Sequence, residues 1–337
     1  MSVKGKKMRG MTAEEKAALV SVGSAAIDES LLAGGMRTTA TAGPGAGGSS
    51  FFLRSGDRRV RLSINPNSPQ RVIPEGDHVA VVRDGKVIAR GTLERPLCHC
   101  PKEAYVTISE RCVFNCKFCP VPLLNGEVKD TTTIVAMVAE AEKTGELEAI
   151  SLTSGVADTP EGEVQRAVKA VKALKERFNF PIGVSIYPTK TSSEELYAAG
   201  ADEVKYNVET MDPEIFARVC PGLSLPFILE SLEKAVQIFG KNHVASNFIL
   251  GLGETDACVK DGVETLTAMG VIPVLRPISP HPLRKGEITV ERPSAERLLR
   301  LARLHREALE RHGLDPRKAH TMCLPCTGCD LTPCRDV

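Results

Sequence analysis

The sequence contains no tryptophan, and aromatic residues make up only 4% of its 337 residues. The apolar residues, 42% of the chain, are therefore mainly aliphatic, and they suffice for a sizeable core. The formal net charge is +1, so composition gives no indication of nucleic-acid binding. Charges or glycines interrupt the apolar runs before they reach the length of a membrane span. The N-terminus has no apolar signal core, and we expect a soluble, cytoplasmic protein.

Cysteine, in contrast, is abundant and unevenly distributed. Of the 11 cysteines, three lie in residues 112–119 and four in residues 323–334. Disulfides are not expected in a cytoplasmic protein. Intervals of two to four residues are instead typical of metal ligands, so we interpret both groups as metal-binding.

Strands and helices alternate from about residue 104 onwards. The strand-like segments are 104–108, 149–152, 182–186, 203–207, 243–250 and 272–278, and the helical segments between them are 131–144, 161–177, 192–199, 212–218, 226–239 and 257–269. Six βα units with short connections indicate right-handed crossovers and a parallel sheet. For this length a partial (β/α)6 barrel fits better than a doubly wound sheet.

The segments on either side of the barrel have a different composition. Residues 1–97 are predicted to contain a helix over 12–34, a glycine-rich loop and a small β-rich unit with a hairpin at Asp84-Gly85. Residues 98–290 form the predicted barrel, and residues 291–337 a charged helix followed by a cysteine-rich tail. The predicted fold is thus α/β: a partial TIM-like barrel with an N-terminal β-rich appendage and a C-terminal cysteine-rich tail.

The first cysteine group follows the first barrel strand directly. Its spacing is Cys112-x3-Cys116-x2-Cys119. Three thiolates so close together can bind three irons of a [4Fe–4S] cluster and leave the fourth iron open to a ligand. The alternative is a zinc site, although zinc sites usually have paired Cys-x2-Cys units.

This segment resembles the radical S-adenosylmethionine (radical SAM) superfamily. Its motif, Cys-x3-Cys-x-aromatic-Cys, is matched at every position, with Phe118 in the aromatic place. The resemblance implies a TIM-like barrel in which S-adenosylmethionine binds the open iron. It also implies that a reductase or ferredoxin supplies an electron, and that the resulting 5′-deoxyadenosyl radical removes hydrogen from the substrate.

The resemblance also implies cofactor contacts at later strand ends. The Thr153-Ser154-Gly155 turn takes the place of a Gly-Gly-Glu-like turn that holds the methionine amino group, although it has no glutamate. The other candidates are Ser185, Tyr187, Asn207, Glu209, for a ribose hydroxyl, and Asn247. For Ser185 and Tyr187, ordinary packing at the end of a strand is an equal alternative. The catalytic residues cannot be identified from the sequence.

Some stretches resemble one branch of the superfamily. The sequences YNVET, ARVCPG and ILGLGETD are similar to stretches of lipoyl synthases, including the archaeal two-component type, and less closely to biotin synthase. This implies sulfur insertion into C–H bonds, with a lipoyl-carrier protein and a partner subunit. The chain departs from standard lipoyl synthases because it has no N-terminal Cys-x4-Cys-x5-Cys set.

The tail carries the second cysteine group, Cys323-x2-Cys326-x2-Cys329-x4-Cys334. Four thiolates can fully bind a second, auxiliary [4Fe–4S] cluster, whereas a structural zinc ion is the alternative. Such a cluster would donate sulfur, bind substrate or relay electrons. Whether Cys98 or Cys100 binds a cluster is left open by the sequence.

Two rival functions remain at this stage. One is radical modification of a protein or peptide side chain, such as C-methylation, although no cobalamin-binding domain is recognisable. The other is a non-catalytic zinc-binding module, which would be colourless. Near the last barrel strand, Arg276, His281 and Arg284 are candidate contacts to an acidic substrate group, with a solvated loop as the alternative.

Overall fold

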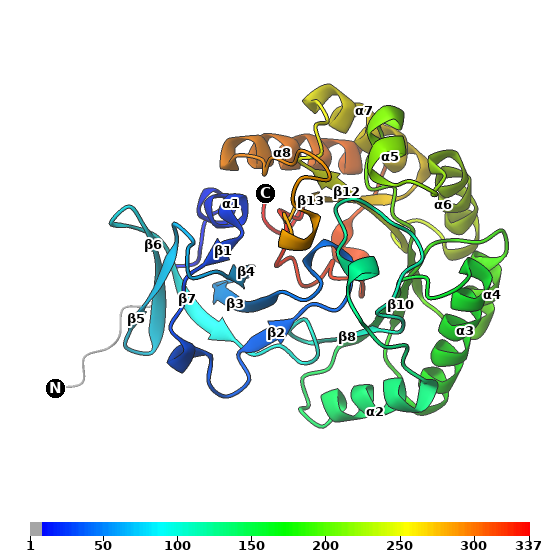
Figure 1. The fold of residues 1–337 in the computed structure, drawn as a ribbon, viewed down its shortest axis with the longest axis horizontal. Coiled ribbons are helices and arrows are strands. Elements are labelled where there is room, and N and C mark those ends of the chain that lie inside the picture. The colour runs from blue at the N-terminus through cyan, green and yellow to red at the C-terminus, as the bar shows by residue number, and fades with distance from the viewer. Residues whose placement is uncertain (1–8) are drawn as a thin grey trace.

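The computed structural model describes residues 9–337 and contains two β-sheets (Figure 1). The larger part is an open barrel whose helices lie on its outer side, and a mostly antiparallel sheet lies beside it. Residues 1–8 of the predicted N-terminal region lie outside the described part.

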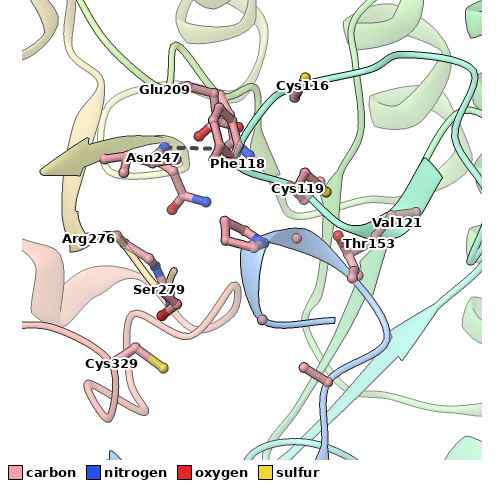
Figure 2. A pocket seen from close by; sticks show the side chains of 18 of the residues that line it. Cys116, Phe118, Cys119, Val121, Thr153, Glu209, Asn247, Arg276, Ser279 and Cys329 are labelled. Atoms are coloured by element: carbon pink, nitrogen blue, oxygen red, sulfur yellow. Dashed lines mark hydrogen bonds between the residues drawn. The ribbon is translucent and has the colours of Figure 1, made fainter. Parts of the chain in front are cut away.

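The barrel sheet has six parallel strands in the order β13-β12-β11-β10-β9-β8. The strands are β8 (Glu103–Thr107), β9 (Ala149–Thr153), β10 (Ile182–Ser185), β11 (Glu203–Lys205), β12 (Val244–Leu250) and β13 (Ile272–Pro277). The helices are α2 (Thr131–Glu142), α3 (Pro160–Arg177), α4 (Ser192–Ala199), α5 (Pro213–Val219), α6 (Leu225–Phe239) and α7 (Asp256–Met269). β8 and β13 are the two edges, so the predicted partial barrel is confirmed, and its strand ends surround the cavity of Figure 2.

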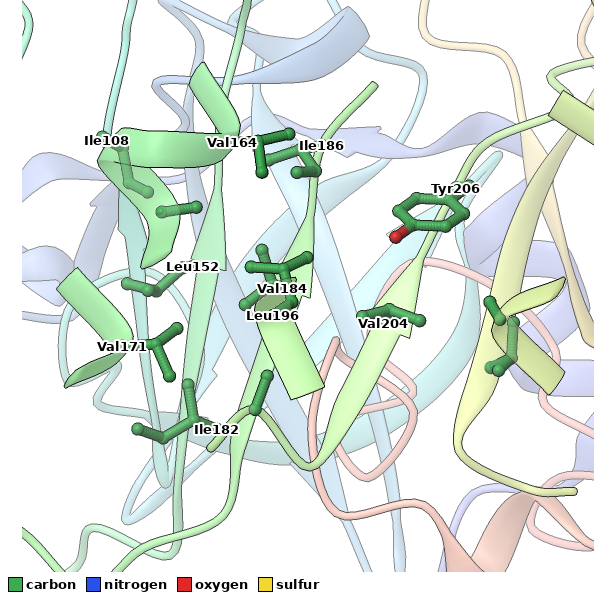
Figure 3. Packing of buried hydrophobic residues seen from close by; sticks show 14 of the residues in the cluster. Ile108, Leu152, Val164, Val171, Ile182, Val184, Ile186, Leu196, Val204 and Tyr206 are labelled. Atoms are coloured by element: carbon green, nitrogen blue, oxygen red, sulfur yellow. The ribbon is translucent and has the colours of Figure 1, made fainter. Parts of the chain in front are cut away.

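The outer face of the barrel sheet is apolar. Alternate residues of the strands, such as Leu152, Val184 and Val204, are fully buried against the helices (Figure 3). The aliphatic core is packed by helix residues including Val164 and Val171 of α3. This burial removes apolar surface from water and orients the opposite, polar face of each strand towards the interior of the barrel.

The N-terminal sheet is larger than the sequence indicates. Its strands are β1 (Ser24–Ala25), β2 (Arg37–Thr39), β3 (Ser49–Ser55), β4 (Arg58–Ile64), β5 (Arg71–Glu75), β6 (His78–Arg83) and β7 (Lys86–Glu94), with short 3-10 turns at Glu29–Leu32 and Gly43–Gly45. The predicted Asp84-Gly85 hairpin joins β6 to β7. β1, β2 and β5 were not predicted, because each is short or interrupted by polar residues.

The predicted helix over 12–34 is too long. Helix α1 spans Ala13–Val22, and Thr12 and Glu15 form a capping box at its start. Gly23 adopts a left-handed conformation with φ of 68° and closes the helix by donating its N–H to Leu19. The segment after Gly23 therefore turns away and pairs with β4 as β1.

A second apolar core connects the N-terminal region with the barrel. It joins Leu19 of α1, Phe51 of β3, Phe248 of β12 and Leu301 of α8 (Ala295–Arg311). The division into regions 1–97, 98–290 and 291–337 stays a prediction, although this shared core links all three. Within residues 9–337, no helix combines the length and apolar content needed to cross a bilayer.

The cysteine-rich tail lies inside the concave face of the barrel sheet (Figure 1). Polar residues of the strands hold it there. Met322 donates its N–H to the Ser151 hydroxyl at 2.8 Å, and Lys205 Nζ donates to the Met322 carbonyl at 2.8 Å. The N–H of Cys323 donates to Glu103 at 3.2 Å. The polar residues on the inner face of the sheet thus bind the backbone of the tail.

His305, on the buried face of α8, makes stability depend on pH. Neither ring nitrogen has a hydrogen-bond partner among the described residues, and burial lowers the pKa of His305 from 6.5 to about 3. Below pH 6.5 the unfolded chain gains a proton that the folded chain does not accept. The free energy of unfolding therefore falls as the pH decreases from 6.5 towards 3, by about 1.4 kcal/mol per pH unit.

Replacing His305 by leucine should remove this loss. We compare the free energy of unfolding of the variant with that of the parent, measured by urea denaturation at pH 7.5 and at pH 5. The difference should shift in favour of the variant by about 2 kcal/mol between the two pH values. The matched control is His78→Leu on the exposed start of β6, which should leave the pH dependence unchanged. An identical pH dependence in His305→Leu and the parent would contradict the prediction.

Candidate active site

One cavity at the carboxyl ends of the barrel strands collects the predicted site residues. Its volume is about 310 Å³. Its walls include all of the predicted cofactor contacts and the first cysteine group: Cys112, Cys116, Cys119, Thr153, Ser154, Gly155, Ser185, Tyr187, Asn207, Glu209 and Asn247. Figure 2 shows Cys116 and Cys119 on one side, with Glu209, Asn247 and Arg276 across the cavity. The individual roles of these residues stay predictions.

The cysteine loop after β8 is fixed by backbone hydrogen bonds to neighbouring loops. Val113 donates its N–H to Val156 at 2.7 Å, and Lys117 donates to Val219 at 2.7 Å. Arg284 Nε donates to the Cys119 carbonyl at 2.8 Å. Arg284 is buried and supports the loop, and its contact to an acidic substrate group stays a prediction.

A buried carboxylate that the sequence analysis missed organises the turn beside this loop. Glu163, in the first turn of α3, accepts hydrogen bonds from the Ser109 hydroxyl at 2.8 Å and the Ser154 hydroxyl at 2.5 Å. Ser154 Oγ also accepts the N–H of Ser109 at 2.9 Å. The Ser154 hydroxyl therefore connects the ends of β8 and β9. Glu163 lies nine residues after Ser154, in the first turn of the following helix, and this spacing is the signal that could have identified it.

Gly155 is required where this turn meets the cysteine loop. A Cβ atom at Gly155 would lie 2.1 Å from the Arg111 carbonyl oxygen and 3.2 Å from Cys112 Cβ. The Gly155 N–H also donates to the Ser109 carbonyl at 2.9 Å. Only a residue without a side chain allows the two loops to approach this closely.

Gly155→Ala should therefore displace Cys112 and weaken metal binding. We expect a loss of affinity of about 10–100-fold at the first cysteine group, the range seen when the support of a metal ligand is removed. The measurement is iron retained by the reconstituted protein during chelator titration. Gly10→Ala is the control, since its Cβ would make ordinary contact, 3.4 Å from Gly56. Equal iron retention in both variants would refute the expectation.

Tyr187 packs against the cysteine loop. Its ring lies 5.0 Å from the ring of Phe114 and 6.2 Å from that of Phe227, measured between centroids. Phe114 belongs to the cysteine loop, so Tyr187 positions this loop through an aromatic contact. Ser185, at the end of β10, accepts the N–H of Ser154 through its carbonyl at 3.1 Å. Both residues have clear packing roles and also line the cavity.

Asn207 and Glu209, after β11, form a connected group with Asn247 of β12. Asn247 donates its N–H to Asn207 Oδ1 at 3.2 Å, and Glu209 donates its N–H to the Asn247 carbonyl at 3.0 Å. Glu209 has φ of 59°, a left-handed conformation that turns its side chain into the cavity. Asn247 Oδ1 is buried and has no partner among residues 9–337, so it is available to a ligand.

The electrostatics of the first cysteine group suit a cation. Burial raises the pKa of Cys119 to about 12 and also raises the pKa of Cys112. Thiolates in such a place need a compensating positive charge, which a bound metal provides. Cys112 Sγ already accepts a hydrogen bond from the Val156 N–H at 3.5 Å. The donor set, three thiols around one cavity with polar groups opposite, fits an iron–sulfur cluster with one open iron.

The tail cysteines separate into two places. Cys323 and Cys329 line the cavity, and Figure 2 shows Cys329 on the side opposite Cys119. Cys334 is not among the cavity-lining residues; burial and the carboxylates of Asp315 and Glu310 raise its pKa, whereas Arg317 lowers it. The predicted ligand set Cys323, Cys326, Cys329 and Cys334 stays a prediction.

The sequence analysis also missed the cationic part of the cavity wall. Arg61, Lys205 and Arg276 line it, and only Arg276 was a candidate from the sequence. Lys205 and Glu203 alternate with apolar residues in β11, as do Tyr105 and Thr107 in β8. This period-two pattern in an otherwise buried strand is the signal that marks an inward polar face.

Three comparisons with known proteins bear on the family. The family model described as "Radical SAM superfamily" matches residues 106–266. The chain is 31% identical over 107 residues to "Bacteriochlorophyllide c C-7(1)-hydroxylase" of Chlorobaculum limnaeum, covering 30% of this chain and 27% of that protein. It is 26% identical over 180 residues to "Probable GTP 3′,8-cyclase" of Methanococcus aeolicus, covering 51% of this chain and 57% of that protein. The matched part of the chain thus spans about a quarter of the length of the first relative and somewhat over half of the length of the second.

A radical SAM methyltransferase from Sphaerobacter thermophilus has a similar fold. The TM-score is 0.52 at 17% identity, over 77% of this chain and 71% of that chain. These comparisons do not support the resemblance to lipoyl synthases. The family match agrees with the cysteine motif, the open barrel and the cavity at its strand ends, and it identifies residues 106–266 as a radical SAM domain.

Proposed function

We propose that this enzyme cleaves S-adenosylmethionine at a [4Fe–4S] cluster held by Cys112, Cys116 and Cys119. The resulting radical would remove a hydrogen atom from a substrate in the same cavity. A radical SAM domain implies the cluster, S-adenosylmethionine and an external electron donor such as a reductase or ferredoxin. The observation that carries the assignment is that the three thiols and the polar strand ends line a single cavity.

The protein's own residues would bind and orient the cofactor. A cluster held by the three cysteines would pass on the electron, received from the external donor, that breaks the C5′–S bond. Glu209 and Asn247 oxygens would accept hydrogen bonds from hydroxyl and amino groups, and the Thr153-Ser154-Gly155 turn offers backbone groups near Cys112. Burial raises the pKa of Glu209 to about 7, so a hydrogen bond from a ribose hydroxyl would favour its ionised form. Phe118, buried in the cysteine loop, excludes water from this side of the cavity.

Sulfur insertion into a C–H bond remains our leading hypothesis for the reaction that follows. It is supported by Cys323 and Cys329, which line the same cavity as the first cysteine group. A sulfur source held by these thiols would lie beside the carbon that has lost its hydrogen. In the lipoyl-type version the substrate is an acyl chain on a carrier protein, and a partner subunit completes the reaction.

Modification of a protein or peptide side chain, such as C-methylation, is the alternative. It is favoured by the likeness in fold to a radical SAM methyltransferase. Both reactions begin with removal of a hydrogen atom, so the chemistry of the first cysteine group is the same. They differ in what the carbon gains afterwards, which is a sulfur atom in one case and a methyl group in the other.

One experiment tests both levels of the proposal. The anaerobically reconstituted enzyme is incubated with S-adenosylmethionine, dithionite and either a lipoyl-carrier peptide or an unrelated peptide. Formation of 5′-deoxyadenosine under reducing conditions is expected, and its absence would refute the radical assignment. Mass spectrometry then distinguishes sulfur gain from methyl gain. If product forms while all sulfide bound to the protein is retained, sulfur insertion from a tail cluster is wrong.

A further inference from the structure

Cys100, in the segment before the barrel, lies among the tail cysteines. Its Sγ is 3.5 Å from Cys323 Sγ, although 223 residues separate the two in sequence. Cys100 and Cys326 are both buried and pack in the same small cluster, and the nearby Cys323 and Cys326 thiols raise the pKa of Cys100. Three thiols from two distant segments thus meet under the side chain of Phe52.

We infer that Cys100, Cys323, Cys326 and Cys329 bind a second iron–sulfur cluster, with Cys100 in the place that the tail spacing gives to Cys334. The inference rests on the proposed function only in treating the chain as an iron–sulfur enzyme. It differs from the sequence-based set because the fourth ligand comes from the segment that enters the barrel.

The barrel sheet fixes Cys323 in this position. Glu103 of β8 accepts the Cys323 N–H at 3.2 Å, and it also accepts a hydrogen bond from the Ser151 hydroxyl. Met322 and Cys323 both have left-handed backbone conformations, with φ of 59° and 67°. This unusual pair of conformations, held by hydrogen bonds to the sheet, turns Cys323 towards Cys100.

Glu103 lies close to two of these thiols and needs to be considered as a ligand. One carboxylate oxygen of Glu103 and the Sγ atoms of Cys100 and Cys323 lie within 4.8 Å of one another. The carboxylate, however, already accepts hydrogen bonds from Ser151 and Cys323. It therefore acts as a support for the ligand segment, while the thiols of Cys326 and Cys329 complete a four-cysteine set.

The surrounding charges match a cluster with four thiolates, which carries net negative charge. Arg59 Nη1 donates to the Cys326 carbonyl at 3.2 Å. Arg276 lines the cavity together with Cys323 and Cys329, and its Nε is buried without a hydrogen-bond partner in the described chain. Asp330, at 3.8 Å, is its closest carboxylate partner. A cation so placed, close to two cysteines, offsets negative charge at this site.

The position of Cys334 argues against its taking part. Its N–H donates to the Val337 carbonyl at 3.1 Å, and Cys334 does not line the cavity that Cys323 and Cys329 share. The proposed cluster instead faces the cavity through Cys323 and Cys329, across from the first cysteine group (Figure 2). A substrate in the cavity would therefore lie between two clusters.

The test compares iron and acid-labile sulfide in full-length protein reconstituted under anaerobic conditions. The parent is expected to hold about eight irons per chain, four for each cluster. Cys100→Ser should hold about four, whereas Cys334→Ser and the neighbouring control Cys98→Ser should each hold about eight. Loss of iron in Cys334→Ser with full retention in Cys100→Ser would overturn the inference, and so would zinc in place of iron.

A second background separates this inference from the proposed function. The triple variant Cys112→Ala, Cys116→Ala, Cys119→Ala should keep about four irons with an absorbance band typical of a [4Fe–4S] cluster. Adding Cys100→Ser should remove them, and circular dichroism checks that the fold is intact. If the triple variant holds no iron, the second cluster is refuted. If it holds about eight and still produces 5′-deoxyadenosine, the proposed function is wrong instead.

Discussion

Cys116→Ala is expected to reduce formation of 5′-deoxyadenosine to the assay background. Cys116 lies in the cavity between Cys112 and Cys119 along the loop, and the loop offers three thiols to one cluster. Removal of a residue that merely supports a metal ligand costs about 10–100-fold, so loss of a ligand itself should exceed about 100-fold. The measurement is the rate of S-adenosylmethionine cleavage with dithionite after anaerobic reconstitution.

Two controls make the result specific. Cys258→Ala, at the start of α7, removes a cysteine that does not line the cavity and should keep full activity. Cys220→Ala is a stricter control, because Cys220 is buried and the nearby Cys116 thiol raises its pKa. Retention of activity in Cys116→Ala would overturn the radical assignment. A matching loss in Cys220→Ala would instead show that Cys220 also acts at the cluster.

The barrel could be predicted closely because its strands and helices differ in pattern. The segment predicted as 149–152 is observed as Ala149–Thr153, and the helix predicted over 192–199 is observed as Ser192–Ala199. Continuous apolar strands followed by capped helices are local signals, so they can be read without knowledge of the tertiary structure. The helix α1 ended early for an equally local reason, the left-handed Gly23, which the periodicity of the segment concealed.

The arrangement of the tail could not be predicted, because it depends on contacts between distant segments. Cys100 and Cys323 are in contact only because Glu103 and Ser151 bind the tail backbone. The sequence predicts Cys334 as the fourth ligand because it follows Cys329 at an interval typical of metal ligands. Spacing identifies thiols that are able to share a metal, but it does not show which thiols the fold brings together.

The candidate cofactor site lies between these two cases. Its residues lie near or just after the carboxyl ends of strands, and parallel strands place these ends at one edge, so the common cavity followed from topology. The supporting residues were missed because they belong to other elements. Glu163 is in α3, and Arg284 is in the loop after β13, yet both hold the turn and the cysteine loop.

A buried ion pair attaches the end of the tail to helix α1. Lys16 Nζ lies 2.7 Å from Asp336 Oδ2, and both side chains are fully buried. Lys16 also donates to the Thr327 carbonyl at 2.6 Å, and Asp336 accepts the Thr332 N–H at 2.8 Å. Burial raises the pKa of Asp336 despite the neighbouring ammonium group. The desolvation cost thus outweighs the attraction, and the pair matters mainly because neither charge tolerates loss of the other.

Asp336→Ala should therefore destabilise the protein by about 3–5 kcal/mol, since it leaves the Lys16 ammonium buried without a counter-charge. The measurement is the free energy of unfolding in urea, made on protein without metal so that cluster binding does not contribute. Lys16→Met combined with Asp336→Leu should recover most of this loss, because no buried charge remains. Glu140→Ala, in the exposed pair with Lys143, should change stability by less than about 1 kcal/mol. If Asp336→Ala is no more destabilising than Glu140→Ala, then the tail is not held to α1 by this pair, and the position of Cys326 and Cys329 depends on the contacts with the barrel and with Arg59 of β4.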